Sequence, residues 1–191
     1  NSRIIGRRFR LVHVVFGSKI FEVSTFRSNA EGSVGNDFGT IEQDVLRRDF
    51  TMNALYYDPL QEQIIDYVGG MRDIKKHILR PVIPIDIIFV EDPVRMLRAI
   101  KYSATTDAKM TFNLRHKIKQ SAQLLSTVSP SRITEELLKI INNVHASQII
   151  AEAIENDLFM YLQPSVWAML YERKDIEISF MENLRKLDNL N

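Results

Sequence analysis

The sequence predicts a mixed α/β part that is followed by an all-helical part. Up to about residue 80, runs rich in β-branched and aromatic residues alternate with turns that contain Gly, Asn or Pro. After about residue 91, apolar residues recur at the three- and four-residue spacing of helices. The 191 residues are 45% hydrophobic and 26% charged, which supports a folded core. The change of pattern along the chain predicts two domains.

The first part is expected to open with a β-hairpin. Residues 9–16 and 19–26 are rich in strand-forming residues, and residues 17–18 (Gly-Ser) supply the turn between them. Residues 28–39 are rich in Ser, Asn and Gly, which predicts a loop. Residues 41–55 are expected to form a helix that leads toward a further strand.

Two short strands and a short helix complete the first part. Residues 54–57 and 63–67 are expected to pair around the Asp-Pro turn at 58–59. The two glycines at 69–70 end this pair, and a short helix is expected over residues 71–77.

The second part is expected to contain several helices. Asp92 can cap the first of them, with Pro93 at its first position and Val94, Leu97 and Ile100 facing inward. The further helices are predicted from apolar positions and start signals at Leu114, Ile118 and Leu125; at Ser129, Pro130, Ile133, Leu137 and Ile140; at Ile149, Ala153 and Ile154; and from Pro164 onward.

Composition narrows the class of protein. The absence of cysteine excludes disulfides and thiolate zinc sites and fits a reducing compartment. No apolar run approaches the length of a membrane span, so we expect a cytoplasmic protein without membrane contacts. The chain begins at Asn1 rather than Met, which suggests that the true N-terminus lies upstream.

The net charge of +1 hides a cluster of positive charge near the start of the chain. Residues 3–10 hold Arg3, Arg7, Arg8 and Arg10 and no acid. Such a cluster can meet the phosphates of a nucleic acid. Charge alone slightly favours the alternative, a solvated face of a strand.

Two segments place opposite charges beside apolar residues. They are residues 47–54 (RRDFTMNA) and 91–98 (EDPVRMLR). A charge at the edge of a core is costly unless something pairs with it. The two segments therefore predict one polar pocket that holds a polar ligand.

The second segment offers a hydrogen-bond acceptor beside a donor. Asp92 and Arg95 are three residues apart at a helix start, and Arg98 follows one turn later. This pair complements the amino group and ring nitrogen of adenine or cytosine, whereas guanine and uracil present the reverse order and would leave buried groups unpaired. On spacing alone, a capping Asp with a surface ion pair is the better interpretation.

The first segment and one strand residue suggest further ligand contacts. Arg48 can bind phosphate and Asp49 can accept a ribose hydroxyl, with Phe50 and Met52 packed behind them; an ordinary interdomain ion pair is the alternative. Glu22, in the middle of a predicted strand, can be a metal ligand or an outward-facing acid. The four histidines show no metal-binding spacing.

Together, these segments resemble the bacterial poly(A) polymerase and CCA-adding tRNA nucleotidyltransferase family. Residues 47–54 match its RRDFT-N-A motif and residues 91–98 its ED-x-x-R motif. Residues 66–73 (DYVGGMRD) look like the linker between them, and residues 129–136 (SPSRITEE) look like the neck-helix motif. The order and spacing agree over roughly residues 1–165.

The resemblance implies the fold and the residue roles. Residues 1–80 would be the C-terminal part of an α/β nucleotidyltransferase head with a mixed sheet, and residues 81–191 an all-helical neck and the start of the body. The active site would lie between them. The implied roles are nucleotide phosphate and ribose contacts for Arg48 and Asp49, base reading for Asp92 and Arg95, support of the phosphates or the neck for Arg98 and Arg132, and the third, catalytic carboxylate that holds Mg²⁺ for Glu22.

Two family features do not occur in the 191 residues. The glycine-rich GG-x-x-R-D loop and the Asp-x-Asp pair are expected upstream of Asn1. The two aspartates hold the magnesium ions in the family, so the chain alone is expected to be inactive. The loop at residues 33–36 is shorter than the poly(A) polymerase branch leads us to expect.

The start of the chain favours one branch of the family. Residues 4–15 (IIGRRFRLVHVV) resemble a signature of the poly(A) polymerases, and Arg7, Arg8 and Arg10 would guide an RNA backbone. The expected activity is the addition of adenylate from ATP to RNA 3′ ends, as in mRNA polyadenylation. CCA addition to tRNA is the alternative within the family, and an inactive RNA- or nucleotide-binding remnant is the alternative from another class.

Overall fold

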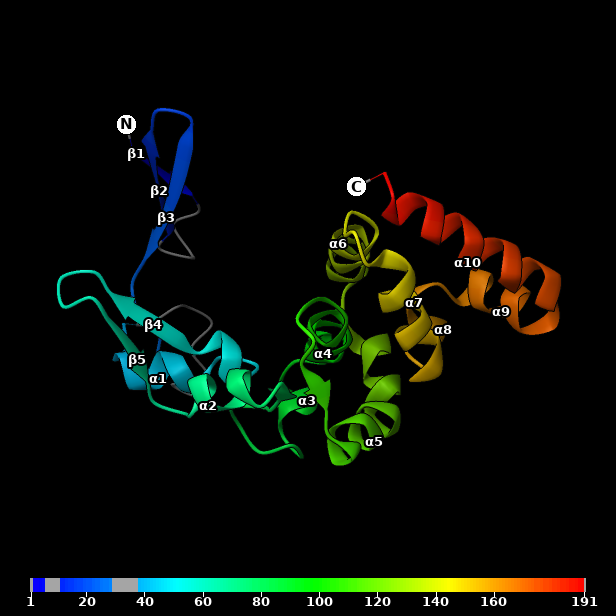
Figure 1. Ribbon diagram of the computed structural model, residues 1–191, viewed down its shortest axis with the longest axis horizontal. Coiled ribbons are helices and arrows are strands. Elements are labelled where there is room, and N and C mark those ends of the chain that lie inside the picture. The colour runs from blue at the N-terminus through cyan, green and yellow to red at the C-terminus, as the bar shows by residue number, and fades with distance from the viewer. Residues whose placement is uncertain (1, 6–10, 29–37, 191) are drawn as a thin grey trace.

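The chain forms three successive parts, a small β-sheet, a mixed α/β part and a helical part (Figure 1). The structure is a computed structural model, and it describes residues 2–5, 11–28 and 38–190. The predicted arginine cluster Arg7, Arg8 and Arg10 and the loop at residues 33–36 lie outside the described residues.

The first part is a three-stranded antiparallel sheet. Its strands are β1 (Ser2–Ile5), β2 (Leu11–Phe16) and β3 (Lys19–Ser24), in that order. The β2–β3 hairpin confirms the prediction, and Gly17 makes its turn with a φ of 60°. Strand β1 was not predicted as a separate element.

The second part contains a shorter helix than the sequence predicts. Helix α1 (Ile41–Leu46) begins at a capping box formed by Thr40 and Gln43, but the predicted helix over residues 41–55 is wrong beyond Leu46. A 3-10 turn, η1 (Thr51–Asn53), follows, because the chain extends at Phe50 to bridge to Pro81. Burial of Phe50 in the core outweighs the local preference for helix.

A strand pair and helix α2 follow, as predicted. Strands β4 (Leu55–Asp58) and β5 (Gln63–Asp66) are antiparallel, and α2 spans Gly70–Lys75. The Asp66 carboxylate accepts hydrogen bonds from the four successive backbone N–H groups of residues 68–71. A Cβ atom at Gly70 would clash with the Thr51 carbonyl oxygen, so this position needs glycine.

The third part is helical, as predicted, with one short strand. Its first predicted helix begins at Val94, one residue later than expected, and a short helix that the sequence did not predict precedes Asp92. Strand β6 (Ile78–Leu79) ends the mixed part. The elements of the helical part are α3 (Ile88–Glu91), α4 (Val94–Thr105), β7 (Lys109–Met110), α5 (Phe112–Ser121), η2 (Ala122–Thr127), α6 (Pro130–Ile141), α7 (Ala146–Glu155), α8 (Phe159–Leu162), α9 (Pro164–Glu172) and α10 (Lys174–Asp188).

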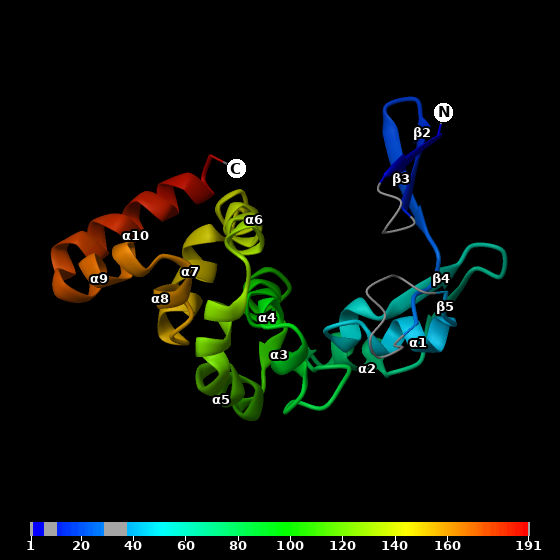
Figure 2. The same cartoon turned by 180° about the vertical axis from the view of Figure 1, so that it is seen from behind.

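The mixed and helical parts share one hydrophobic core. Phe50 packs in the same cluster of buried residues as Phe89, Met96 and Leu114. The parallel pairing of β6 with β7 adds backbone hydrogen bonds between the two parts. Figure 2, the view from behind, shows the β1–β3 sheet standing apart from this junction. Among the described helices, none has the length and apolar character needed to cross a bilayer.

Candidate functional site

A polar cavity of about 890 Å³ lies where the mixed part meets helices α4 and α6. Most of its lining comes from three segments far apart in the sequence, the end of α1 with the residues after it, the α3–α4 junction with the start of α4, and the start of α6. The other lining residues are Arg27, Asn53, Ile83 and Pro84. All six predicted nucleotide-binding residues line it: Arg48, Asp49, Asp92, Arg95, Arg98 and Arg132. Five further polar residues line it. Arg47, Asn53, Glu91 and Glu136 lie in the predicted motifs but were given no individual role, and Arg27 was not singled out.

Asp49 and Arg98 form the buried side of the cavity. The Asp49 side chain is only 5% exposed, and its Oδ1 accepts hydrogen bonds from the backbone N–H of Phe50 and from Asn53. Arg98 Nε donates to Asp49 Oδ2 at 2.5 Å, and Arg98 Nη2 donates to the Tyr102 hydroxyl at 2.8 Å. Burial lowers the pKa of Arg98, but the negative charge of Asp49 and the hydrogen bond to it outweigh burial, so the pKa is raised overall.

Arg48 is tied into the mixed part rather than free in the cavity. Its Nη2 lies 2.8 Å from Asp44 Oδ2, and its guanidinium lies over the Tyr56 ring at 5.5 Å. The Tyr56 hydroxyl donates to the same Asp44 oxygen at 2.7 Å. Burial alone would raise the pKa of Asp44, but hydrogen bonds from Tyr56 and Arg48 lower it. Arg48 therefore joins α1 to β4 as well as lining the cavity.

Arg47 differs from the other five lining arginines in its partners. Within the described residues, each of the others has an ion pair with a carboxylate, whereas Arg47 has none. Its Nη1 donates to the Ser28 carbonyl. Burial and then the neighbouring charge of Arg27 lower the pKa of Arg47, the negative charge of Asp44 offsets part of this, and the charge of Arg95 lowers the pKa more weakly. This corner of the cavity therefore has positive charge that is available for an anion.

Asp92 lies in the break between α3 and α4, with an extended backbone. Its Oδ1 accepts from the Val94 N–H at 3.2 Å, but Pro93 rather than Asp92 is at the N-cap position of α4. Both carboxylate oxygens accept from Arg132 Nη2, at 3.0 and 3.1 Å. The start of α6 therefore holds the carboxylate that was predicted to read a base.

Arg95 has other partners. It donates to Glu91 Oε2 at 3.0 Å and to the Arg47 carbonyl at 3.0 Å. In the described part of the chain, neither a hydrogen bond nor an ion pair joins Arg95 to Asp92, so the surface ion pair weighed as an alternative is not present. The cavity contains both predicted base-reading groups, each held by a different neighbour.

Glu22 does not line this cavity. It lies in the middle of β3, its side chain is 67% exposed, and its Oε1 is 3.2 Å from His13 Nε2. Among the residues that the structure describes, no group of three His, Asp or Glu side chains is placed to hold a metal ion. These residues do not by themselves fit a magnesium site, and Glu22 as a ligand stays a prediction.

The cavity is suited to a ligand that combines phosphates with a polar ring. Arginines can bind phosphate oxygens, and a carboxylate beside a guanidinium can bind the edge of a base. The match with known proteins agrees with this chemistry. The poly A polymerase head domain matches residues 1–80, and the probable RNA and SrmB-binding site of polymerase A matches residues 109–170.

Individual relatives extend the comparison. Poly(A) polymerase I of Salmonella typhi is 36% identical over 99% of this chain and 44% of its own length. The CCA-adding enzyme of Lactobacillus helveticus is 34% identical over 80% of this chain and 40% of its own length. The crystal structure of the Bacillus stearothermophilus CCA-adding enzyme in complex with CTP has a TM-score of 0.73 at 33% identity, covering 84% of this chain and 40% of that one.

The fold is that of the head and neck of the solved CCA-adding enzyme, which is a nucleotidyltransferase. The chain belongs to the family that contains the bacterial poly(A) polymerases and the CCA-adding enzymes. Poly(A) polymerases I match it at 36–38% identity and CCA-adding enzymes at 30–34%. The chain spans less than half the length of these curated relatives.

Proposed function

We propose that the protein to which this chain belongs adds adenylate from ATP to RNA 3′ ends without a nucleic-acid template. The observation that carries this proposal is the meeting of the three predicted motifs in one cavity, which contains all six predicted nucleotide-binding residues. The higher identity to poly(A) polymerases supports adenylate addition over CCA addition.

The nucleotide is proposed to lie with its phosphates toward Arg47 and its base toward α3 and α4. Arg47, with Arg27 beside it, is the part of the cavity where positive charge is least compensated. Asp49 accepts a ribose hydroxyl while keeping Arg98 in place. Arg48 donates to Asp44 and so supports this region indirectly. The proposal therefore gives the main phosphate contact to Arg47 rather than to Arg48.

The base is proposed to be read by Asp92 and Arg95. Asp92 must then exchange at least part of its contact with Arg132 for the amino group of the base. Arg95 donates to the neighbouring ring nitrogen. Adenine satisfies both groups, whereas guanine and uracil would leave buried polar groups unpaired, which strongly disfavours their binding.

Several finer points of the proposal concern the whole protein. Residues 1–80 are the C-terminal part of the head and residues 81–191 the neck and the start of the body. The protein is proposed to be cytoplasmic and to take part in mRNA polyadenylation. It is proposed to need Mg²⁺, with Glu22 as one supporting ligand. Because the 191 residues contain no Asp-x-Asp pair, the chain alone is expected to incorporate no ATP into RNA.

CCA addition is the second candidate, because a solved CCA-adding enzyme with bound CTP has the same fold at 33% identity. One experiment separates the two. The full-length protein is given an unstructured RNA or a tRNA that lacks its CCA end, each with ATP, with CTP and with both. Long adenylate tails on the unstructured RNA support the proposal, whereas addition that stops after C, C and A on tRNA alone supports the second candidate. Binding of ATP without any addition would indicate the inactive remnant.

A further inference from the structure

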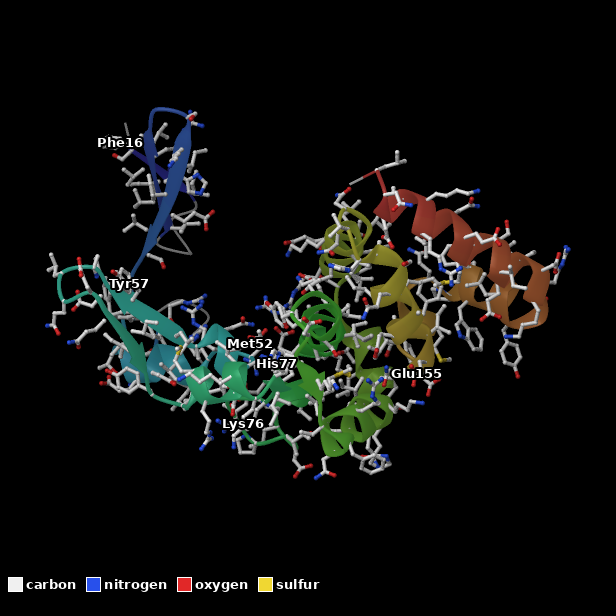
Figure 3. The ribbon with its side chains drawn as sticks, viewed as in Figure 1. Phe16, Met52, Tyr57, Lys76, His77 and Glu155 are labelled. Carbon is white, nitrogen blue, oxygen red and sulfur yellow. The ribbon has the colours of Figure 1, made fainter. Side chains whose placement is uncertain are left out.

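A basic and aromatic surface lies outside the cavity, and we call it the β6–β7 surface. It consists of Lys75, Lys76, His77, Lys109 and Phe112, all exposed, and of His116, which stacks on Phe112. None of these residues lines the cavity. Figure 3 labels Lys76 and His77 where α2 ends, and Figures 1 and 2 show α2 and α5 along the same edge of the molecule with α3 between them.

The pairing of β6 with β7 brings these residues together from two distant segments. The backbone N–H of Lys109 donates to the His77 carbonyl at 2.8 Å, and Lys109 pairs with Ile78. Phe112 follows Lys109 by three residues, which is about 10 Å of extended chain at most. The surface therefore combines the end of the mixed part with the start of α5.

The lysines of this surface carry charge without a partner. Within the described residues, Lys75, Lys76 and Lys109 have no ion pair. By contrast, Lys117, which lies on α5 with Phe112, pairs with Asp86 at 2.9 Å. The acids nearest in sequence are Asp73, which is buried and bonded to Arg80, and the exposed Asp107. Three neighbouring unpaired cations repel one another, so a ligand with repeated negative charge would bind favourably.

The aromatic residues distinguish between anionic ligands. Phe112 is 83% exposed, and its ring lies nearly parallel to that of His116, with an interplanar angle of 9° and centroids 6.1 Å apart. An exposed aromatic ring beside cations is the arrangement that binds single-stranded nucleic acid, because bases stack on the ring while the phosphates meet the cations. An acidic protein partner would form ion pairs with the lysines but has no base to stack on the exposed Phe112 ring.

We infer that the β6–β7 surface binds single-stranded RNA at nucleotides away from the reactive 3′ end. Lys76 and Lys109 contact phosphates, and Phe112 stacks on a base. This inference rests on the proposed function, because it assumes that the substrate of the cavity is the 3′ end of an RNA. One RNA molecule would then be bound twice, by its 3′ end in the cavity and by nucleotides away from that end on the β6–β7 surface.

The test measures RNA binding by the full-length protein with fluorescence anisotropy over a range of salt concentrations. The probe is an unstructured oligoadenylate with a 3′-deoxy end, which binds but is not extended. The double variant Lys76→Ala, Lys109→Ala is compared with Lys174→Ala, Lys186→Ala, which removes the same charge from α10. Loss of two phosphate contacts is expected to reduce the salt-dependence slope by about 1.4, at about 0.7 per contact. An unchanged slope, or an equal change in the control, overturns the inference.

Phe112 is tested separately from charge. Phe112→Leu is expected to weaken binding of oligoadenylate about tenfold, and Phe112→Tyr to keep it, because tyrosine retains an aromatic face. An abasic RNA should bind both variants equally. Equal binding of oligoadenylate by the two variants would overturn the stacking role. ATP affinity without RNA is expected to stay unchanged in every variant, so failure of the wild-type protein to bind ATP would count against the proposed function rather than against this surface.

Discussion

At the residue scale, the cavity contains two kinds of arginine. Arg48 is held by Asp44 and by the Tyr56 ring, whereas Arg47 has no carboxylate partner among the described residues. The sequence motif presents the two as equivalent neighbours. The partners of Arg48 lie four and eight residues away on α1 and β4, so the difference between the arginines depends on folding. The motif led to the prediction that Arg48 binds phosphate, and it gave no sign that Arg48 has partners of its own in Asp44 and Tyr56.

Arg47→Ala is expected to weaken ATP binding more than Arg48→Ala does. A hydrogen bond to a charged group contributes about 1.5–3 kcal/mol, which corresponds to a loss of affinity of at least about tenfold. Arg48→Ala should instead lower the free energy of unfolding, because it removes the shorter of the two arginine ion pairs of the buried Asp44. ATP titration and urea unfolding of the full-length protein measure the two effects. The opposite assignment of effects would show that Arg48 is the phosphate ligand.

Asp92→Ala or Arg95→Ala is expected to relax base choice as well as to slow catalysis. Each change removes half of the donor–acceptor pair, and such a pair contributes roughly 1–3 kcal/mol of discrimination against a wrong base. The measurement is the ratio of kcat/KM values for ATP and each of the other three nucleotides. Equal losses with all four nucleotides would mean that these residues have a structural role only.

At the element scale, local patterns predicted strands and long helices well and short elements badly. The β2–β3 hairpin and helices α4 to α7 follow from strong periodicity and turn signals in the sequence. Helix α1 ends at Leu46 because Phe50 is drawn into a core that other segments supply. Helix α3 has only four residues, which is too short for a periodic pattern to indicate it.

Gly70→Ala tests the turn that begins α2. The added Cβ would meet the Thr51 carbonyl oxygen, which belongs to backbone rather than to a movable side chain. We expect the free energy of unfolding to fall by about 1–3 kcal/mol. Gly17→Asn is a suitable control, because Gly17 has open space around it and asparagine tolerates its positive φ. Urea unfolding of both variants gives the comparison, and a loss as large for Gly17→Asn would refute the steric argument.

At the scale of the whole molecule, the cavity depends on the joint packing of the mixed and helical parts. Phe50, from the mixed part, lies in the core next to Asp49, which reaches across to Arg98 in α4. The charges beside apolar residues in segments 47–54 and 91–98 predicted one polar pocket, and the family resemblance implied its place between the two parts. The residue patterns alone did not predict the pairing of residues 49 positions apart, because such contacts leave no periodic signal in the sequence.

Phe50→Ala is expected to weaken both folding and ATP binding. Loss of the Phe50 side chain from the core should lower the free energy of unfolding by about 3–5 kcal/mol and displace the neighbouring Asp49. Phe159→Ala, in the body, removes a side chain of the same size from the same core at a greater distance from the cavity. It should lower stability without a comparable loss of ATP affinity in the folded protein. If Phe159→Ala lost as much ATP affinity as Phe50→Ala, general destabilisation would explain the loss of ATP binding in both variants.

If Asp92 reads the base as proposed, its contact with Arg132 makes nucleotide selection a competition for the carboxylate. A base does not enter a vacant acceptor, because the carboxylate already has a guanidinium partner from α6. A base that offers an amino group at the right place compensates for displacing that partner, and one that offers a carbonyl does not. In this proposal Arg132 of α6 competes with every nucleotide for the Asp92 carboxylate. The loss of the Arg132 contact then costs every base the same, and only a base with an amino group at that place replaces the lost hydrogen bonds.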